Sequence, residues 1–154
     1  MTNKVKSIPD GYHSLTPYMV ATNAASAIEF YKKAFGATER MRLAGPDGKV
    51  MHAELEIGDS VIMLGEECAG GGSGPLSIGG APVSMYLYTE DVDAVFSRAI
   101  DAGATVKRPV EDQFYGDRSG TLTDPFGHVW SVATHVEDVS PEEIKRRTKA
   151  LFGG

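Results

Sequence analysis

The chain repeats one order of elements, and this repeat constrains its fold more than any other feature of the sequence. Residues 27–38 (AIEFYKKAFGAT) align without a gap on residues 94–105 (AVFSRAIDAGAT), and both copies contain a helical pattern followed by Gly-Ala-Thr. A short apolar run precedes each copy, and three more apolar runs separated by turn residues follow it. Each half is therefore predicted to contain a strand, a helix and three strands.

The element boundaries follow from periodicity and from turn residues. In the first half, Asn23 is a suitable helix N-cap and Gly36 a suitable left-handed C-cap. The first half is predicted to have a helix at 24–35 and strands at 14–21, 37–43, 49–57 and 61–64. The second half is predicted to have a helix at 91–102, strands at 83–89, 105–110, 121–124 and 129–134, and an irregular segment at 111–120.

Two segments lie outside the repeat. Residues 69–82 are rich in glycine but lack the strand-to-helix spacing of a phosphate-binding loop, so they are predicted to be a flexible connector. Ser140, Pro141 and Glu143 fit a capping box with proline in the first helical turn. A short charged helix is therefore predicted to end at about Phe152.

The duplicated pattern predicts an α+β fold built from two βαβββ modules. Halves of about 55 residues bury only about 60% of their surface, so neither is expected to be stable alone. We expect one domain over 1–154, in which the helices cover one sheet face and the other face curves around a ligand cavity. The expected parts are module 1 at about 14–67, the connector at 69–82, module 2 at about 83–136, and the C-terminal helix at 140–152.

Composition argues against several classes of partner. Fifteen Lys and Arg against 21 Asp and Glu give a net charge of -6, which opposes binding to nucleic acid or to an anionic membrane. The polar N-terminus and the lack of an apolar run of about 20 residues predict a cytoplasmic protein without signal peptide or membrane span. Cys68 cannot form an internal disulfide, and its acidic neighbours disfavour a nucleophilic thiol.

Four segments carry a resemblance to a known family: TPYMVATNAASAIEFYKKAFGA, MHAELEIGDSVIML, VSMYLYTEDVDAVFSRAIDAGA and YGDRSGTLTDPFGHVWSVATHVEDVSPEE. Together they resemble the PhnB-like branch of the vicinal oxygen chelate superfamily, which includes glyoxalase I, bleomycin-resistance proteins and extradiol dioxygenases. The resemblance covers roughly residues 15–143. It implies paired βαβββ modules, usually a homodimer, and a concave sheet around a small-molecule site.

The resemblance also implies where a metal would be held in metal-dependent members. The four ligand positions fall on Thr16, Met63, Ser84 (Val83 if the strand slips by one residue) and Ser131. A divalent ion needs several imidazole or carboxylate donors, and these residue types are weak neutral ligands. We therefore expect no glyoxalase-type metal and no other cofactor, and we assign these four positions to ligand binding.

One predicted strand carries a row of ionisable side chains. His52, Glu54 and Glu56 alternate along the strand and therefore share one face. The opposite face, predicted to be the helix-covered core, contains Met51, Ala53, Leu55 and Ile57. His52 and Glu54 are candidates for an acid–base pair or for ligands of a displaced metal site. The alternative is that the strand lies at a sheet edge and the row is a solvated face.

The segment Tyr115-Gly-Asp117-Arg118 is a second candidate ligand site. Arginine presents a planar fork to carboxylate or phosphate, aspartate can orient it, and tyrosine adds a ring with a hydroxyl group. The alternative is a structural contact between Asp117 and Arg118 that holds the loop against the sheet. The residue types favour neither interpretation over the other, and the resemblance favours a functional role because this segment is part of the family's recognisable signature.

The remaining histidines are weaker candidates. His128 follows the turn that Asp124 is predicted to cap, and it could be a ligand-binding group or an exposed turn residue. Trp130 alternates with the implied ligand position on its strand and is predicted to pack under a helix. His13 and His135 flank the module ends and are predicted to be structural or exposed.

Three functional hypotheses follow. The leading one is metal-independent binding of a small organic molecule in a cleft lined by both modules of a homodimer. The second is a lyase or isomerase that uses His52 as base and Arg118 to hold an anionic, carbonyl-containing substrate. The third is an interaction domain whose cleft binds nothing.

Overall fold

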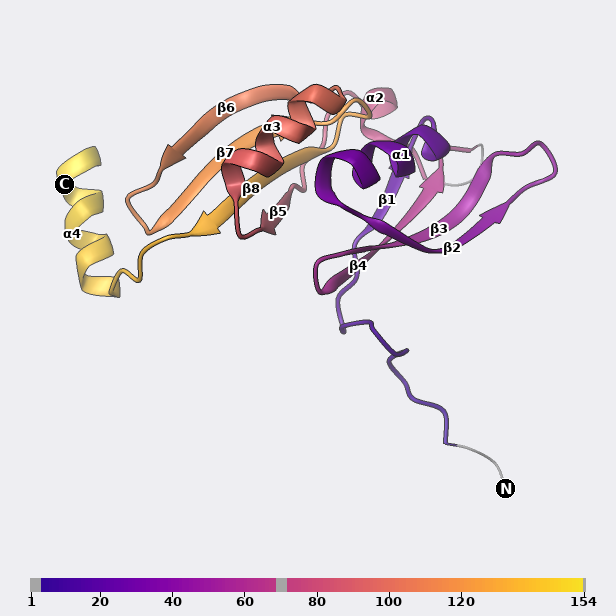
Figure 1. The fold of residues 1–154 in the computed structure, drawn as a ribbon, viewed down its shortest axis with the longest axis horizontal. Coiled ribbons are helices and arrows are strands. Elements are labelled where there is room, and N and C mark those ends of the chain that lie inside the picture. The colour runs from indigo at the N-terminus through magenta and orange to yellow at the C-terminus, as the bar shows by residue number, and fades with distance from the viewer. Residues whose placement is uncertain (1–3, 69–71, 154) are drawn as a thin grey trace. The chain divides into compact units, whose positions relative to one another are not determined.

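The computed structural model describes residues 4–68 and 72–153, which belong to two compact units, Met1–Gly80 and Ala81–Gly154. Each unit contains one mixed four-stranded sheet and a helix packed against it (Figure 1). The α+β class, the repeated βαβββ order and the C-terminal helix are therefore confirmed.

The first unit has a sheet in the order β1-β4-β3-β2, in which only the β1–β4 pair is parallel. Helix α1 connects β1 to β2 and packs against β1, β3 and β4. The elements are β1 (Tyr18–Ala21), α1 (Ala24–Phe35), β2 (Thr38–Ala44), β3 (Val50–Ile57), β4 (Ser60–Glu66) and the short α2 (Pro75–Ile78).

The second unit has the same arrangement, with the order β5-β8-β7-β6 and a parallel β5–β8 pair. Helix α3 packs against β6, β7 and β8. The elements are β5 (Met85–Tyr88), α3 (Val92–Ala102), β6 (Thr105–Asp112), β7 (Asp117–Thr123), β8 (Val129–His135) and α4 (Pro141–Phe152).

Helix α1 begins and ends at the predicted residues, and α3 begins at Val92, one residue later than predicted, because Asp91 is its N-cap. The side chain of Asn23 accepts a hydrogen bond from the backbone N–H of Ser26, and Asp91 does the same for Ala94. Gly36 ends α1 with φ 68°, in the left-handed region that glycine adopts at little cost. The residues that flank each helix therefore set its first and last turns.

A second contact at each helix start was not apparent from the sequence. The carboxylate of Glu66, at the end of β4, accepts a hydrogen bond from the backbone N–H of Ala24 at 2.7 Å. In the second unit the hydroxyl of Thr134, on β8, accepts one from the backbone N–H of Val92 at 2.9 Å. Each last strand therefore satisfies a backbone donor in the first turn of its module's helix.

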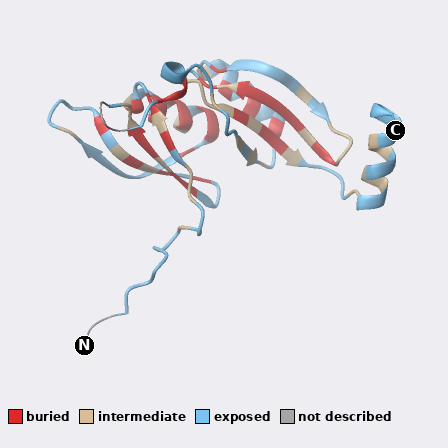
Figure 2. Cartoon of the chain, turned by 180° about the vertical axis from the view of Figure 1, so that it is seen from behind, coloured by how far each residue is buried: buried red, intermediate tan, exposed pale blue. Residues whose placement is uncertain are grey.

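The core lies between each helix and its sheet, and Figure 2 shows buried residues, in red, on both the helices and the strands. Ala53, Leu55 and Ile57 of β3 are buried as predicted. The prediction for Met51 is wrong, since this residue is 59% exposed. Met51 lies next to the β2–β3 turn and borders a cavity there.

The segment predicted to be irregular at 111–120 is mostly a regular hairpin. Strand β6 continues to Asp112, and β7 begins at Asp117. Gly116, in the turn, has φ 105°, and a Cβ at this position would lie 2.2 Å from the carbonyl oxygen of Glu137. Only glycine fits this close approach, which ties the hairpin turn to the chain after β8.

The glycine-rich connector is partly ordered by a side chain outside it. Residues 69–71 lie outside the described residues, but α2 occupies 75–78. Both carboxylate oxygens of Glu67 accept hydrogen bonds at 2.7 Å, one from the backbone N–H of Gly74 and one from the hydroxyl of Ser77. Composition alone did not indicate this short helix.

Helix α4 confirms the predicted N-cap serine and first-turn proline, whereas the Glu143 carboxylate accepts from Arg146 and Arg147. The hydroxyl of Ser140 accepts a hydrogen bond from the backbone N–H of Glu143 at 3.2 Å, and Pro141 is the first helical residue. Arg147 donates to the carbonyl oxygen of Phe114 at 2.9 Å, so α4 contacts the β6–β7 turn. Among the helices of the described ranges, none is long and apolar enough to span a membrane.

Candidate functional site

Each sheet has one face that its own helix does not cover. Strand pairing places Tyr18, Met63, Glu54 and Met41 in one row across the first sheet, on the side opposite the core residues. We call these two sheet faces the first and second open faces. The first contains Tyr18, Met41, Leu43, His52, Glu54 and Met63; the second contains Tyr86, Tyr88, Asp117, Ser119, Thr121, Ser131 and His135.

The first open face brings the predicted pair His52 and Glu54 into contact. His52 Nε2 lies 3.0 Å from Glu54 Oε2, and both side chains are partly buried. The ring of Tyr18 lies beside that of His52, with 5.7 Å between centroids. Carboxylate contact orients an imidazole, so this pair has the arrangement that acid–base chemistry requires.

The N-terminal segment adds a residue to this pair that sequence reasoning missed. The hydroxyl of Tyr12 donates to Glu54 Oε1, and the guanidinium of Arg40 lies 5.2 Å from the centre of the Tyr12 ring. Burial, followed by the bond to Glu54, raises the pKa of Tyr12 to about 12. The bonds from Tyr12 and His52 lower the pKa of Glu54. Tyr12 precedes the repeat, so no periodic pattern pointed to it.

The second open face contains a more buried cluster around Asp117. Asp117 is 4% exposed, and its Oδ2 accepts hydrogen bonds at 2.9 Å from the hydroxyls of both Tyr86 and Tyr88. His135 Nδ1 lies 2.9 Å from Oδ1. Burial alone would raise the pKa of Asp117, but the bonds from His135, Tyr88 and Tyr86 together lower it. Asp117 is therefore a buried carboxylate anion held by three donors.

His135 connects this cluster to a surface cavity. Its Nε2 lies 2.8 Å from Asp138 Oδ1, and the two carboxylates, Asp117 first, raise the pKa of His135. Sequence reasoning predicted His135 to be structural or exposed because no partner stood at ligand spacing. Asp117 and His135 meet because β7 and β8 pair, and the periodic pattern of a single strand does not predict such a cross-strand partner. The cavity, of about 590 Å³, is bounded by Tyr88, Thr89, Glu90, Thr134 and His135.

The four positions implied for a metal do not fit one. Thr16 precedes β1 and Ser84 precedes β5, as does Val83. Met63 lies on the first open face, and Ser131 Oγ lies 2.9 Å from the hydroxyl of Thr121 on the second. Hydroxyl and thioether groups are weak donors to a divalent ion. In the described part of the chain, no three His, Cys, Asp or Glu side chains are arranged to hold a metal.

Arg118 lies on the helix-covered side of the second sheet, whereas its neighbour Asp117 lies on the open face. The guanidinium donates two hydrogen bonds of 2.9 Å to the carboxylate of Asp93 on α3, and one of 3.2 Å to Asp112 on β6. Its carboxylate partners are therefore these two residues and not Asp117. This geometry favours a structural role in which Arg118 holds α3 to the sheet edge.

The remaining candidate residues lie in turns, in the core or on the surface. Asp124 caps its turn as predicted, because Oδ1 accepts from the backbone N–H groups of Phe126 and His128. Oδ2 accepts from the indole N–H of Trp130 at 2.9 Å, and Trp130 is buried in the α3 core as predicted. His128 is half-buried in this turn. Tyr115 packs edge-on against Phe114 and His13 is exposed.

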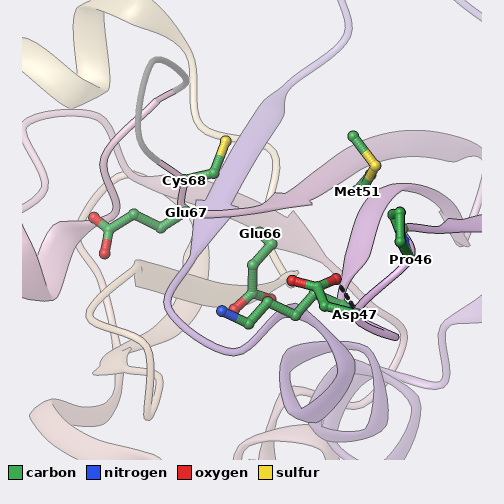
Figure 3. A pocket seen from close by; sticks show the side chains of 8 residues that line it. Pro46, Asp47, Met51, Glu66, Glu67 and Cys68 are labelled. Atoms are coloured by element: carbon green, nitrogen blue, oxygen red, sulfur yellow. Dashed lines mark hydrogen bonds between the residues drawn. The ribbon is translucent and has the colours of Figure 1, made fainter.

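A second cavity, also of about 590 Å³, lies at the β2–β3 turn of the first unit (Figure 3). Two carboxylates beside this cavity accept hydrogen bonds from backbone N–H groups: Glu66, at the end of β4, from Ala24 in α1, and Glu67, the next residue, from Gly74 before α2. The cavity is bounded by Gly45, Pro46, Asp47, Lys49, Met51, Glu66, Glu67 and Cys68. Cys68 is exposed at its edge.

Comparison with known proteins identifies the family. Residues 13–132 match the model of the Glyoxalase/Bleomycin resistance protein/Dioxygenase superfamily. The matched region contains the first module and most of the second, and it ends at Val132 within β8, so His135 of the second open face lies beyond it. The chain belongs to this superfamily, and the resemblance stated from its sequence is confirmed.

Individual relatives agree with this assignment. The uncharacterized protein Rv0887c of Mycobacterium tuberculosis is 48% identical over 136 residues, which cover 86% of this chain and 80% of that protein. The structure of the Arabidopsis thaliana gene product At5g48480 matches with a TM-score of 0.65 and 28% identity, covering 79% of this chain and 98% of that one. A Bacillus cereus PhnB protein, described as a putative 3-demethylubiquinone-9 3-methyltransferase, shares the fold with a TM-score of 0.62 and 18% identity, covering 79% of this chain and 99% of that one.

Proposed function

We propose that this protein binds a small organic molecule on the open faces of its sheets, without a glyoxalase-type metal. The observation that carries the proposal is the exposure of large side chains there: Tyr18 is 56%, Leu43 55% and Tyr88 60% exposed. Sheet faces normally bury such side chains, and exposed groups of them mark binding surfaces. The polar groups among these side chains would orient the bound molecule.

The donor set supports the metal-independent part of the proposal. The four inherited positions hold Thr16, Met63, Ser84 and Ser131, which suit contacts to an organic ligand better than coordination of an ion. The superfamily includes bleomycin-resistance proteins, a name that refers to resistance to an organic compound. A homodimer is part of the proposal, since the resemblance implies one.

Native mass spectrometry of freshly purified protein tests the proposal, with elemental analysis of the same sample. We expect a dimer, a co-purified or added organic ligand, and less than stoichiometric Zn, Ni, Mn or Fe. The double variant Tyr18→Ala/Tyr88→Ala should lose the ligand. Arg118→Gln is the matched control and should retain it, because Arg118 faces α3. A tightly bound metal lost on substituting Met63 and Ser131 would overturn the proposal.

A second candidate function is an acid–base enzyme, and one contact favours it. His52 and Glu54 are 3.0 Å apart with Tyr12 on the same carboxylate, so the imidazole is held ready to accept a proton. Arg118 is engaged by Asp93 and Asp112, so this candidate relies on His52 and Glu54 instead of the arginine.

Kinetics of two variants test this candidate on a library of small carbonyl compounds. His52→Gln should lower turnover by at least about 100-fold, the usual contribution of a general base, with an unchanged melting temperature. Arg118→Gln should change turnover less than twofold. Equal turnover in the His52 variant and the unmodified protein would reject His52 as the base and leave only the binding function.

A further inference from the structure

We infer that the second open face binds a planar aromatic carbonyl compound, with its ring on Tyr88 and its carbonyl oxygen accepting a hydrogen bond from His135 Nε2. The inference rests on the proposed binding function and names the class of ligand for one of its two faces. It depends on three features of the described residues: a fixed imidazole, a replaceable partner and an exposed ring.

The orientation of the His135 ring is fixed by its contact with the buried Asp117. Nδ1 contacts Asp117 at 2.9 Å, and Asp117 is itself held by the hydroxyls of Tyr86 and Tyr88. The buried carboxylate needs a donor at Nδ1, so Nε2 is the nitrogen directed away from the cluster. Nε2 also faces a carboxylate, Asp138, so both ring nitrogens carry protons and Nε2 is a donor. The raised pKa of His135 agrees with this charged form.

The present partner of Nε2 can be replaced at little cost. Asp138 lies beyond β8, and its side chain is fully exposed, whereas that of Asp117 is buried. Exposed ion pairs contribute little net free energy, because water and side-chain entropy offset the attraction. An oxygen acceptor that also gains burial in the adjoining cavity can therefore displace Asp138 from Nε2.

The ring of Tyr88 supplies the apolar part of the site. It borders the same cavity as His135, and its hydroxyl is tied to Asp117 at 2.9 Å. Tyr86 lies beside it at 5.2 Å between centroids and is tied to the same oxygen. Rings anchored at their hydroxyl ends lose little freedom when a ligand stacks on them, which favours a planar aromatic body.

Charge selects a neutral ligand. Glu90 borders the cavity, Asp138 remains beside it after displacement, and the chain has a net charge of -6. The three carboxylates of Glu90, Asp117 and Asp138 outnumber the single imidazolium of His135, so a carboxylate ligand would meet net negative charge, although its oxygens could accept the same hydrogen bond. A ketone, aldehyde or lactone oxygen on an aromatic ring provides the acceptor without the repulsion.

Titration with a matched pair of bicyclic compounds, 1-indanone and indane, tests the inference by ¹H–¹⁵N spectra of the histidine rings. We expect 1-indanone to shift the His135 Nε2 resonance and to bind at least about fivefold more tightly than indane, which lacks the oxygen and its hydrogen bond. Benzoate should bind more weakly than 1-indanone. The complete chain is used, so both open faces are present in every titration.

Variants assign the effect to single residues. His135→Gln should remove the preference for 1-indanone over indane, and Tyr88→Leu should weaken both probes. His13→Gln, an exposed histidine outside the site, should change nothing. Equal affinities of the two probes for the unmodified protein, an unmoved His135 resonance or stronger binding of benzoate would overturn the inference. Any of these results together with a ligand retained in native mass spectrometry would leave the proposed function intact.

Discussion

The two units have cores of the same architecture but differ on their open faces. Both sheets have the same strand order, and both module helices receive a hydrogen bond from the last strand, from Glu66 in one and Thr134 in the other. Both open faces contain an imidazole–carboxylate contact, but its construction differs. His52 and Glu54 are two residues apart on β3, whereas Asp117 on β7 meets His135 across the sheet.

The difference separates the features that packing requires from those that it leaves free. Each sheet needs a helix on one face, and the backbone N–H groups at the start of each helix need acceptors. Both features therefore recur in the two units, although different side chains supply the acceptor. A glutamate and a threonine perform the same cap. The open faces carry no such packing requirement, so they hold a half-buried pair in one unit and a buried, three-donor cluster in the other.

The largest effect is expected from the contrast between the two faces of the first sheet. Leu64 is fully buried under α1, so Leu64→Ala should lower the free energy of unfolding by about 2–5 kcal/mol in urea denaturation. Leu43→Ala, on the open face, should change it by less than about 0.5 kcal/mol. A comparable loss in both variants would show that the first open face is a buried core and would break the comparison.

The next effect separates the two imidazole–carboxylate pairs. Asp117→Asn keeps the shape but removes the charge that three donors contact, and should cost about 1.5–3 kcal/mol of unfolding free energy. Glu54→Gln, in the less buried pair, should cost less than half of that. Amide hydrogen exchange should show the lost protection in the second unit for Asp117→Asn, and equal losses would erase the distinction.

The helix-start contacts should be worth similar amounts in both units. Glu66→Ala and Thr134→Val each remove one acceptor, and each should cost about 0.5–2 kcal/mol, the usual range for a lost N-cap. Exchange of the Ala24 and Val92 amide protons measures the local effect. Glu66→Gln retains an acceptor and serves as the control. Unchanged exchange in either variant would mean that its cap does not stabilise the helix.

The smallest effect is a dependence of stability on pH that His135 should give to the second unit. Its pKa is raised, so the charged ring stabilises the fold below the ordinary histidine pKa of about 6.5, and this contribution is lost as pH rises through the raised value. His135→Gln should flatten this part of the urea midpoint against pH. The His13→Gln variant should retain it; a profile that stays unchanged without His135 would assign the titration elsewhere.

Much of the fold could be predicted because its signals are local. The helices at 24–35 and 92–102 follow from apolar periodicity and from caps such as Asn23 and Gly36. Predictions failed where a distant contact decides the local structure. The hairpin at Gly116 depends on the carbonyl oxygen of Glu137, and α2 depends on Glu67. A residue's neighbours in the sequence do not carry this information.

The candidate site divides in the same way. The His52 and Glu54 pair could be predicted because both residues lie on one strand, where spacing fixes the face. Tyr12 could not, because it lies in a segment without a periodic pattern, and His135 could not, because it meets Asp117 of a different strand. Arg118 shows the converse, since a promising motif residue is engaged by Asp93 on a helix 25 residues earlier.

Residue types and their spacing along the chain are sufficient to establish the duplicated βαβββ order, the family and the weak donors at the implied metal positions. Only the tertiary structure shows that His135 contacts Asp117 and that Arg118 lies on the helix-covered side of its sheet. Strand pairing sets these contacts by joining residues distant in the sequence, as Asp117 and His135 show. Their free energy depends on burial, which only the packed fold creates.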